Sequence, residues 1–253
     1  MLIIFLYRKK ISHDLIKRGL ILGGLLGLNL ITAASALNYT TATNTAFFPA
    51  ICGIVAAFYA WGFQQQKVAW VTWLASLLSV FGALLLIFEK TNLTHQWLGD
   101  LLAFVAPLFY AAYIFRLDYD TKTREIFSLW PLLGIELVAM WVLCVLGTAM
   151  LGTGFSIANL QFKDYGVVIY VGLITTLLPA TVSIFFQRYL SPISVAFIFI
   201  LEPIWGAIIA ALYLGEKLSL RGYVGGCLIV LASLINTLAS LKSNQAKDPA
   251  AQC

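Results

Sequence analysis

Charged residues are scarce in this chain. Asp, Glu, Lys and Arg together make up 11% of its 253 residues, whereas 61% of the residues are hydrophobic. A soluble globular domain carries about 25% charged residues and about 45–50% apolar ones. So few charges cannot cover a surface that faces water. The composition therefore excludes an ordinary soluble protein.

Histidine is also rare, and the cysteines form no pattern. The two histidines, His13 and His95, fall in separate predicted loops. Three of the four cysteines lie inside apolar blocks and Cys253 is the last residue, so there is no disulfide framework or metal-ligand spacing. The sequence also lacks the clustered His, Asp or Glu of a membrane enzyme and the repeated filter or charge rings of a channel. We therefore expect no catalysis, no cofactor and no bound metal.

What the chain does contain is a series of long apolar blocks. An α-helix needs about 20 apolar residues to cross a bilayer. Backbone amides find no water in hydrocarbon, so the blocks must be helical. We predict an all-α polytopic membrane protein with eight complete transmembrane helices, over 19–37, 45–63, 68–88, 98–115, 128–151, 165–187, 192–214 and 220–241.

The net charge of +5 carries information about topology. Short loops that are rich in Lys and Arg stay on the cytoplasmic side of a membrane. With the segment before the first helix inside, twelve of the 16 basic residues lie inside, and those outside are Lys90, Lys163, Lys217 and Arg221. We therefore predict a multi-pass protein of the cell membrane (plasma or inner) with a polar cytoplasmic tail over 242–253. Its partner is then the lipid bilayer, and no nucleic-acid partner is expected.

Two stretches of the chain are similar at an offset of 150 residues. Residues 39–67 align without a gap with residues 189–217, and seven of the 29 positions are identical. The alignment places the second predicted helix on the seventh, a step of five helices, so the two copies cross the membrane in opposite directions. Inverted repeats of this kind build secondary transporters, whose substrate site lies near the midplane between the copies.

The repeat also predicts how the chain is divided. A five-helix unit fits residues 91–241, the second repeat, completely. Residues 1–90 hold three helices, preceded by "MLIIFLYRKK", which is like the last two turns of another spanning helix. We therefore expect 1–90 to be a remnant of the first repeat in an inverted five-plus-five design. Such a chain is N-terminally truncated and lacks the first helix and most of the second.

Three stretches carry a resemblance to a known family: "ALNYTTATNTAFF", "LEPIWGAIIAALYLGEKLS" and "GYVGGCLIVLASLI". On these the chain resembles an EamA-type member of the drug/metabolite transporter superfamily. The resemblance implies ten helices in two inverted five-helix repeats. The chain departs from it at the missing first helices, and at "GFQQQK", where Gln66 stands at the position equivalent to Glu216.

Two carboxylates lie away from the ends of the predicted spans, Glu136 and Glu202. An ionised side chain at the bilayer centre costs about 2.5–3.5 kcal/mol on insertion scales, so such residues usually face the bundle interior or a wet cavity. The predicted topology places both at a similar depth. Each is a candidate proton-accepting residue on a translocation pathway. The structural alternative is that each carboxyl forms a hydrogen bond that joins two helices.

Other candidates for the pathway lie near Glu202 or in mid-span. Pro203 removes a backbone donor and so frees carbonyl groups, and broken helices near the midplane commonly hold transporter sites. Trp205 shares a helical face with Glu202, and an aromatic ring beside a carboxyl suits a small, partly apolar or cationic solute. Tyr110 and Asn29 are mid-span polar candidates, with interhelical hydrogen bonding as the alternative for each.

Glycines recur at four-residue spacing in two of the predicted helices, as Gly19, Gly23 and Gly27 and as Gly222 and Gly226. Small residues at this spacing let two helices approach closely. We expect close helix packing there, with a homodimer interface as the alternative.

Together these features predict an integral membrane transporter without enzymatic activity. We expect it to move a small organic metabolite or drug-like solute by alternating access, with proton coupling as one version of the mechanism. The alternative is a truncated remnant that does not transport, or a wrongly assigned start of such a transporter.

Overall fold

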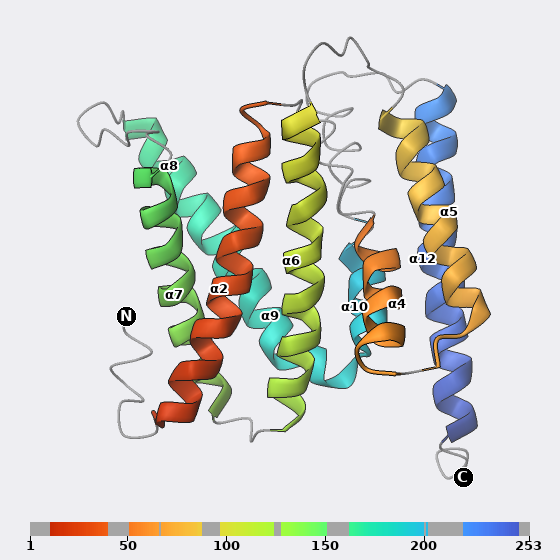
Figure 1. The fold of residues 1–253 in the computed structure, drawn as a ribbon, viewed down its shortest axis with the longest axis horizontal. Coiled ribbons are helices and arrows are strands. Elements are labelled where there is room, and N and C mark those ends of the chain that lie inside the picture. Colours follow the sequence, from red (N-terminus) through yellow and green to blue (C-terminus); the bar gives the residue numbers. More distant parts are fainter. Residues whose placement is uncertain are drawn as a thin grey trace. The chain divides into compact units, whose positions relative to one another are not determined.

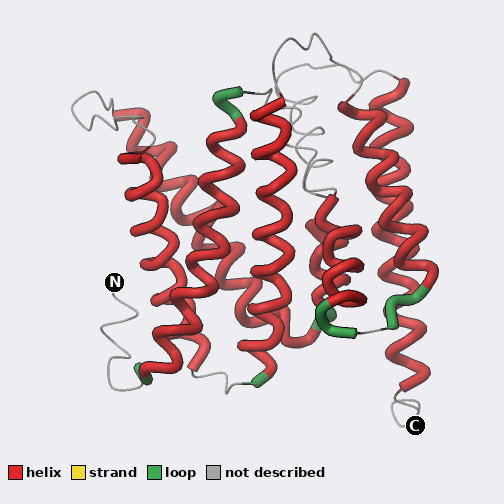
Figure 2. Tube along the Cα trace, in the orientation of Figure 1, coloured by secondary structure: helices red, strands yellow, loops and turns green. Residues whose placement is uncertain are grey.

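A computed structural model describes residues 11–39, 51–65, 67–87, 97–123, 128–150, 162–199, 201 and 220–247. All regular structure in these residues is helical, and each of the eight predicted helices has a helical counterpart (Figures 1 and 2). Seven counterparts are single helices: α2 His13–Ala36, α4 Cys52–Gly62, α5 Trp70–Ile87, α6 Trp97–Lys122, α7 Leu129–Met150, α10 Pro192–Phe199 and α12 Leu220–Lys247. The other is built from α8 Phe162–Tyr170, η5 Val171–Leu177 and α9 Leu178–Phe186, which the short η6 Gln187–Tyr189 follows.

Five helices are long and apolar enough to cross a membrane by length and composition. They are His13–Ala36, Trp97–Lys122, Leu129–Met150, Val168–Tyr189 and Leu220–Ala239. Within the described residues α4 and α5 contribute shorter apolar helices, and α10 spans eight residues. The protein is therefore an all-α, multi-pass membrane protein with five candidate spans in its described part. The predicted number of eight complete spans stays a prediction.

Some helices continue beyond the apolar blocks that predicted them. Helix α6 runs to Lys122, although its apolar block ends at residue 115. Its last two turns carry ion pairs one helical turn apart, Arg116 with Asp120 and Asp118 with Lys122. Pairs at this spacing stabilise a helix, so the backbone stays helical after the hydropathy has fallen. Helix α12 likewise continues through polar residues to Lys247.

A π-helix interrupts the predicted helix over 165–187. Segment η5 covers Val171–Leu177, and the N–H of Leu178 bonds the carbonyl of Leu173, five residues back. The next residue, Pro179, has no N–H to continue the α-helical ladder. The hydroxyls of Thr175 and Thr176 both donate to the Val171 carbonyl oxygen, at 2.8 and 3.0 Å. The wide turn therefore precedes a proline, and threonine side chains satisfy a carbonyl within it.

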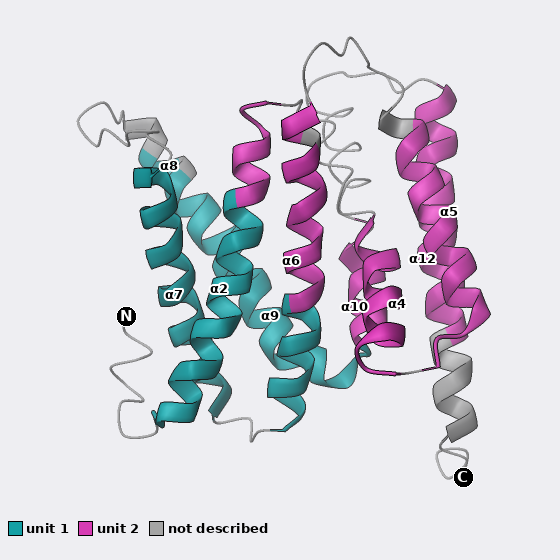
Figure 3. Cartoon of the chain, in the orientation of Figure 1, with its two compact units in different colours: residues 1–31, 113–191 teal, residues 32–112, 192–253 magenta. Residues whose placement is uncertain are grey.

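The chain forms two compact units, each built from two separate stretches (Figure 3). Unit 1 comprises Met1–Ile31 and Tyr113–Ser191, and unit 2 comprises Thr32–Ala112 and Pro192–Cys253. Each unit takes helices from both predicted repeats. Packing units and sequence repeats are thus different divisions of this chain, and the division at residue 90 stays a prediction.

In unit 1, glycines bring α2 against α7. A Cβ atom at Gly23 would collide with the Glu136 carbonyl oxygen and would lie 2.7 Å from the Ala139 Cβ atom. One at Gly27 would lie 2.9 Å from the Leu143 side chain. The predicted close approach is therefore confirmed for this helix. Because the two glycines are used within one copy of the chain, they do not supply the surface that the homodimer alternative needed.

In unit 2, α5 and α12 pack as an antiparallel pair. A Cβ atom at Gly82 would lie 2.6 Å from the Gly225 carbonyl oxygen, and the Thr72 hydroxyl donates to Asn236 Oδ1 at 3.0 Å. Residue numbers thus rise along α5 where they fall along α12, so the two helices run in opposite directions. The core that α5 and α12 share with α10 consists of buried apolar side chains: Ala75, Ala83, Phe197, Ile229 and Ala232. The prediction of close packing at Gly226 was wrong, because a Cβ atom there would meet nothing within 4 Å.

The contact at Gly23 yields a test of helix packing. Gly23→Ala should lower the free energy of unfolding by about 1–3 kcal/mol, because the added methyl overpacks the α2–α7 contact. Thermal unfolding of the detergent-solubilised chain, followed by tryptophan fluorescence, measures the loss. Gly24→Ala is the matched control, since a Cβ atom there would meet nothing within 4 Å. Equal thermal stability of the two variants would contradict the packing described.

Candidate functional site

Glu136 lies in the interior of unit 1. It follows the first residue of α7 by seven positions, which is about 10.5 Å along the helix axis. Its side chain is 0% exposed, and nearly all of the α7 residues before it are buried too. The close approach of α2 at Gly19 and Gly23 covers the backbone at this position. The packing of α2 thus encloses a carboxyl group well inside a candidate membrane span.

A hydrogen bond from a neighbouring helix holds the Glu136 carboxyl group. The Tyr113 hydroxyl of α6 donates to Glu136 Oε1 at 2.7 Å. The other oxygen, Oε2, is buried and has no hydrogen-bond partner, and no salt bridge to Glu136 is formed within the described part of the chain. The contact joins α6 to α7, as the structural alternative for this residue expects. It also leaves one carboxyl oxygen for another partner.

A second polar cluster joins α2 to α6 near the end of α6. Asp120 is 0% exposed and accepts hydrogen bonds from Arg18 Nη1 at 2.5 Å and from Arg116 Nε at 2.9 Å. The Tyr119 ring centre lies 5.6 and 5.7 Å from the two guanidinium carbons. Arg18 also pairs with the exposed Asp14 at 3.0 Å. Charge-assisted bonds of this kind are strong and directional, so the cluster fastens the two helices together.

The sequence analysis did not find the Asp120 cluster. The predicted helix over 98–115 ends before Arg116, whereas α6 runs through Lys122. The sequence did contain a signal for helix here, because oppositely charged residues recur four positions apart. These pairs are Arg116 with Asp120 and Asp14 with Arg18. The contact between Arg18 and Asp120 spans 102 positions, and no local pattern predicts it.

In unit 2, Tyr110 contacts the helix that leads to Glu202. Its ring meets the Phe199 ring edge to face, with centroids 4.8 Å apart and planes at 89°. Helix α10 ends at Phe199, and the N–H of Leu201 turns back to the Ile198 carbonyl at 3.1 Å. Helix α10 is thus followed by a turn at Leu201.

The structure describes only some of the predicted pathway residues. Glu136 and the half-buried Asn29 belong to unit 1, and the half-buried Tyr110 belongs to unit 2. Glu202, Pro203 and Trp205 lie outside the described residues. Among the residues that are described, no group of three or more His, Cys, Asp or Glu side chains is placed to hold a metal ion.

The comparison with protein families identifies this chain. The model of the EamA-like transporter family matches residues 97–238, which run from the start of α6 into α12 and make up more than half of the sequence. The chain belongs to the EamA-like transporter family. Membership confirms the resemblance found in the sequence and the expectation that this EamA protein is a transporter and not an enzyme.

A similar curated protein is also named as a transporter. An "Uncharacterized transporter" of Clostridium kluyveri is 20% identical to this EamA protein over 221 residues. The similarity covers 84% of the present chain and 68% of the relative. It therefore extends well beyond the part that the family model matches.

The cluster around Asp120 generates a stability prediction for this EamA protein. Asp120→Asn should lower the free energy of unfolding by about 2–3 kcal/mol, since it removes the one carboxylate that two partly buried guanidiniums share. Chemical denaturation in detergent measures the change. Asp118→Asn is the matched control, because Asp118 pairs with one cation, Lys122, whose side chain is 44% exposed, so its removal should cost less than that of Asp120. An Asp120→Asn loss no larger than the control loss would contradict a fastening role.

Proposed function

We propose that this EamA-family protein moves a small organic solute across the membrane by alternating access, with Glu136 as a proton-binding residue that couples to the movement. The observation that carries the proposal is the fully buried Glu136 carboxyl with its hydrogen bond to Tyr113, inside a chain that belongs to a transporter family. Ionisable residues inside membrane spans usually mark substrate or proton pathways.

The bond to Tyr113 supplies a physical route for coupling. An ionised carboxylate accepts hydrogen bonds at both oxygens, whereas a protonated one can also donate through its hydroxyl. Tyr113 donates to Oε1, and Oε2 has no hydrogen-bond partner. The ionised and the protonated forms of Glu136 therefore need different surroundings. Gain or loss of a proton therefore favours different arrangements of α6 against α7. A proton that binds one arrangement better shifts the population toward it.

The packing inside unit 2 supports the proposed inverted repeat. Helix α4 packs on α5, and α10 packs on α12. The offset of 150 residues relates α5 to α12, whereas α4 and α10 are different parts of the two predicted helices that it aligns, 45–63 and 192–214. Helix α4 also packs on α10, and α5 packs on α12, so each aligned block of the first repeat contacts the block of the second repeat that matches it. The antiparallel register of α5 and α12 also brings the region of Ser79 opposite that of Ile229, positions that the same offset equates. A two-fold axis in the membrane plane relates pairs in this manner.

The remaining pathway residues are proposed from the sequence. Glu202, Pro203 and Trp205 are assigned to a broken helix that lines the path, and the end of α10 at Phe199 supports a break there. Tyr110, through its contact with Phe199, is assigned to the same region. Asn29 is assigned to the path as a polar residue of α2. We also propose the cytoplasmic orientation of the C-terminus, from the distribution of basic residues.

Transport by the reconstituted chain tests the proposal. Proteoliposomes are screened with labelled small organic cations and partly apolar neutral solutes, first for counterflow exchange and then for accumulation driven by a pH gradient. The unaltered chain should show both activities for at least one solute. Glu136→Gln should keep counterflow and lose at least about tenfold in gradient-driven accumulation, because the amide still accepts a bond from Tyr113 but binds no proton.

Further variants separate coupling from folding. Asp118→Asn makes the same carboxylate-to-amide change at a helix end and should retain accumulation. Glu202→Gln tests the second carboxylate in the same assay. Undiminished gradient-driven accumulation by Glu136→Gln would remove Glu136 from the mechanism. Absence of counterflow for every solute in the unaltered chain would contradict the transport function itself.

A further inference from the structure

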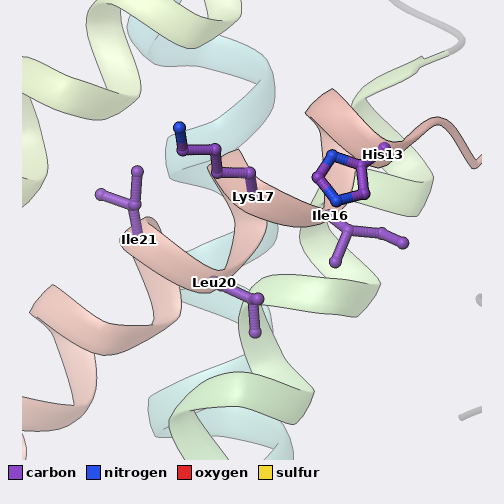
Figure 4. Close-up of a pocket in the computed structure, with 5 residues that line it drawn as sticks. All are labelled: His13, Ile16, Lys17, Leu20 and Ile21. Carbon is purple, nitrogen blue, oxygen red and sulfur yellow. The ribbon is translucent and has the colours of Figure 1, made fainter.

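One face of α2 is open where the helix begins. Five side chains at helical spacing line a shallow groove there: His13, Ile16, Lys17, Leu20 and Ile21 (Figure 4). All five are exposed, and Leu20 has 52% of its surface accessible. The groove has a volume of about 370 Å³, close to the lower limit of pockets that hold small ligands.

The opposite face of the same turns is closed. Leu15 and Leu22 are buried, and Gly19 and Gly23 lie against α7. Helix α2 therefore has an inner face that packs on protein and an outer face that carries the groove. Its span of 24 residues is long and apolar enough to cross a membrane, so the outer face at its first turns lies at the height of lipid headgroups.

The groove combines positive charge with apolar surface. Lys17 forms no ion pair with any described residue, because the nearby Asp14 pairs with Arg18 instead, at 3.0 Å. The His13 imidazole lies one turn before Lys17 and adds a hydrogen-bonding group. Along the sequence, Arg8, Lys9 and Lys10 precede this turn. Basic clusters directly beside a transmembrane helix attract anionic lipids.

We propose that this α2 groove binds an anionic phospholipid. Lys17 and His13 contact the phosphate, and Ile16, Leu20 and Ile21 cover the first acyl carbons. The pattern fits a lipid better than a free anion, because three of the five lining side chains are aliphatic. It fits a lipid better than a protein because the groove is small and lies on a spanning helix. The proposal does not depend on the transported solute.

Spin-labelled lipids test this binding in the full chain. The protein is reconstituted in phosphatidylcholine bilayers with a trace of labelled phosphatidylglycerol or labelled phosphatidylcholine, and the motionally restricted fraction of each label gives its relative association constant. At low ionic strength phosphatidylglycerol should be preferred severalfold. Lys17→Gln should lower the preference by up to about fivefold, and Lys17→Arg should retain it.

The control is Lys67→Gln, which removes an equal charge from an exposed position after α4 and should leave the preference unchanged. Circular dichroism of each variant verifies that helix content is equal. Equal association of the two lipids with the unaltered chain would overturn the proposal, as would an equal loss in Lys17→Gln and Lys67→Gln. Displacement of the labelled lipid by inorganic phosphate at constant ionic strength would assign the groove to a free anion instead.

Discussion

The hydrocarbon interior of a membrane offers no hydrogen-bond partners, and the rest of this structure depends on that constraint. It explains why each predicted block has a helical counterpart among the described residues, since only internal backbone bonds satisfy the amides. It also explains why hydroxyls within the apolar helices turn back to their own helix, as Ser76 does to the Thr72 carbonyl at 2.8 Å and Thr181 to the Leu177 carbonyl at 2.7 Å. Buried groups that cannot do this, such as Asn236 and Glu136, bond to a neighbouring helix.

The same medium changes what holds helices together. Apolar side chains gain little by leaving lipid for protein, so helix association in a membrane depends on close contact and on polar bonds. In unit 1 the glycines of α2 supply the contact against α7, and in unit 2 Gly82 supplies it against α12. Close packing has a consequence for chemistry. In unit 1 it encloses Glu136, whose side chain is 0% exposed.

Sequence reasoning predicted the class, the helices and the family, because all three follow from long apolar runs and local motifs. It was less successful where polar residues continue a helix, because hydropathy alone ends α6 at its first charges. The contact of Asp120 with Arg18 could not be predicted either, because the two residues lie 102 positions apart in the sequence. Gly226 illustrates a different limit, because four-residue spacing does not say which face of α12 meets α5. For Glu136 the sequence identified the residue, and the structure added its partner, Tyr113.

The proposed proton coupling requires Glu136 to change its protonation or its hydrogen bonding during transport. Infrared difference spectroscopy of the reconstituted chain, recorded with and without a transported solute, measures this most directly. Proton coupling through Glu136 predicts a carboxyl C=O band that changes when solute is added. This band should be absent from the difference spectrum of Glu136→Gln. A difference spectrum without a carboxyl signal, or a carboxyl signal that persists in Glu136→Gln, would contradict proton coupling through Glu136.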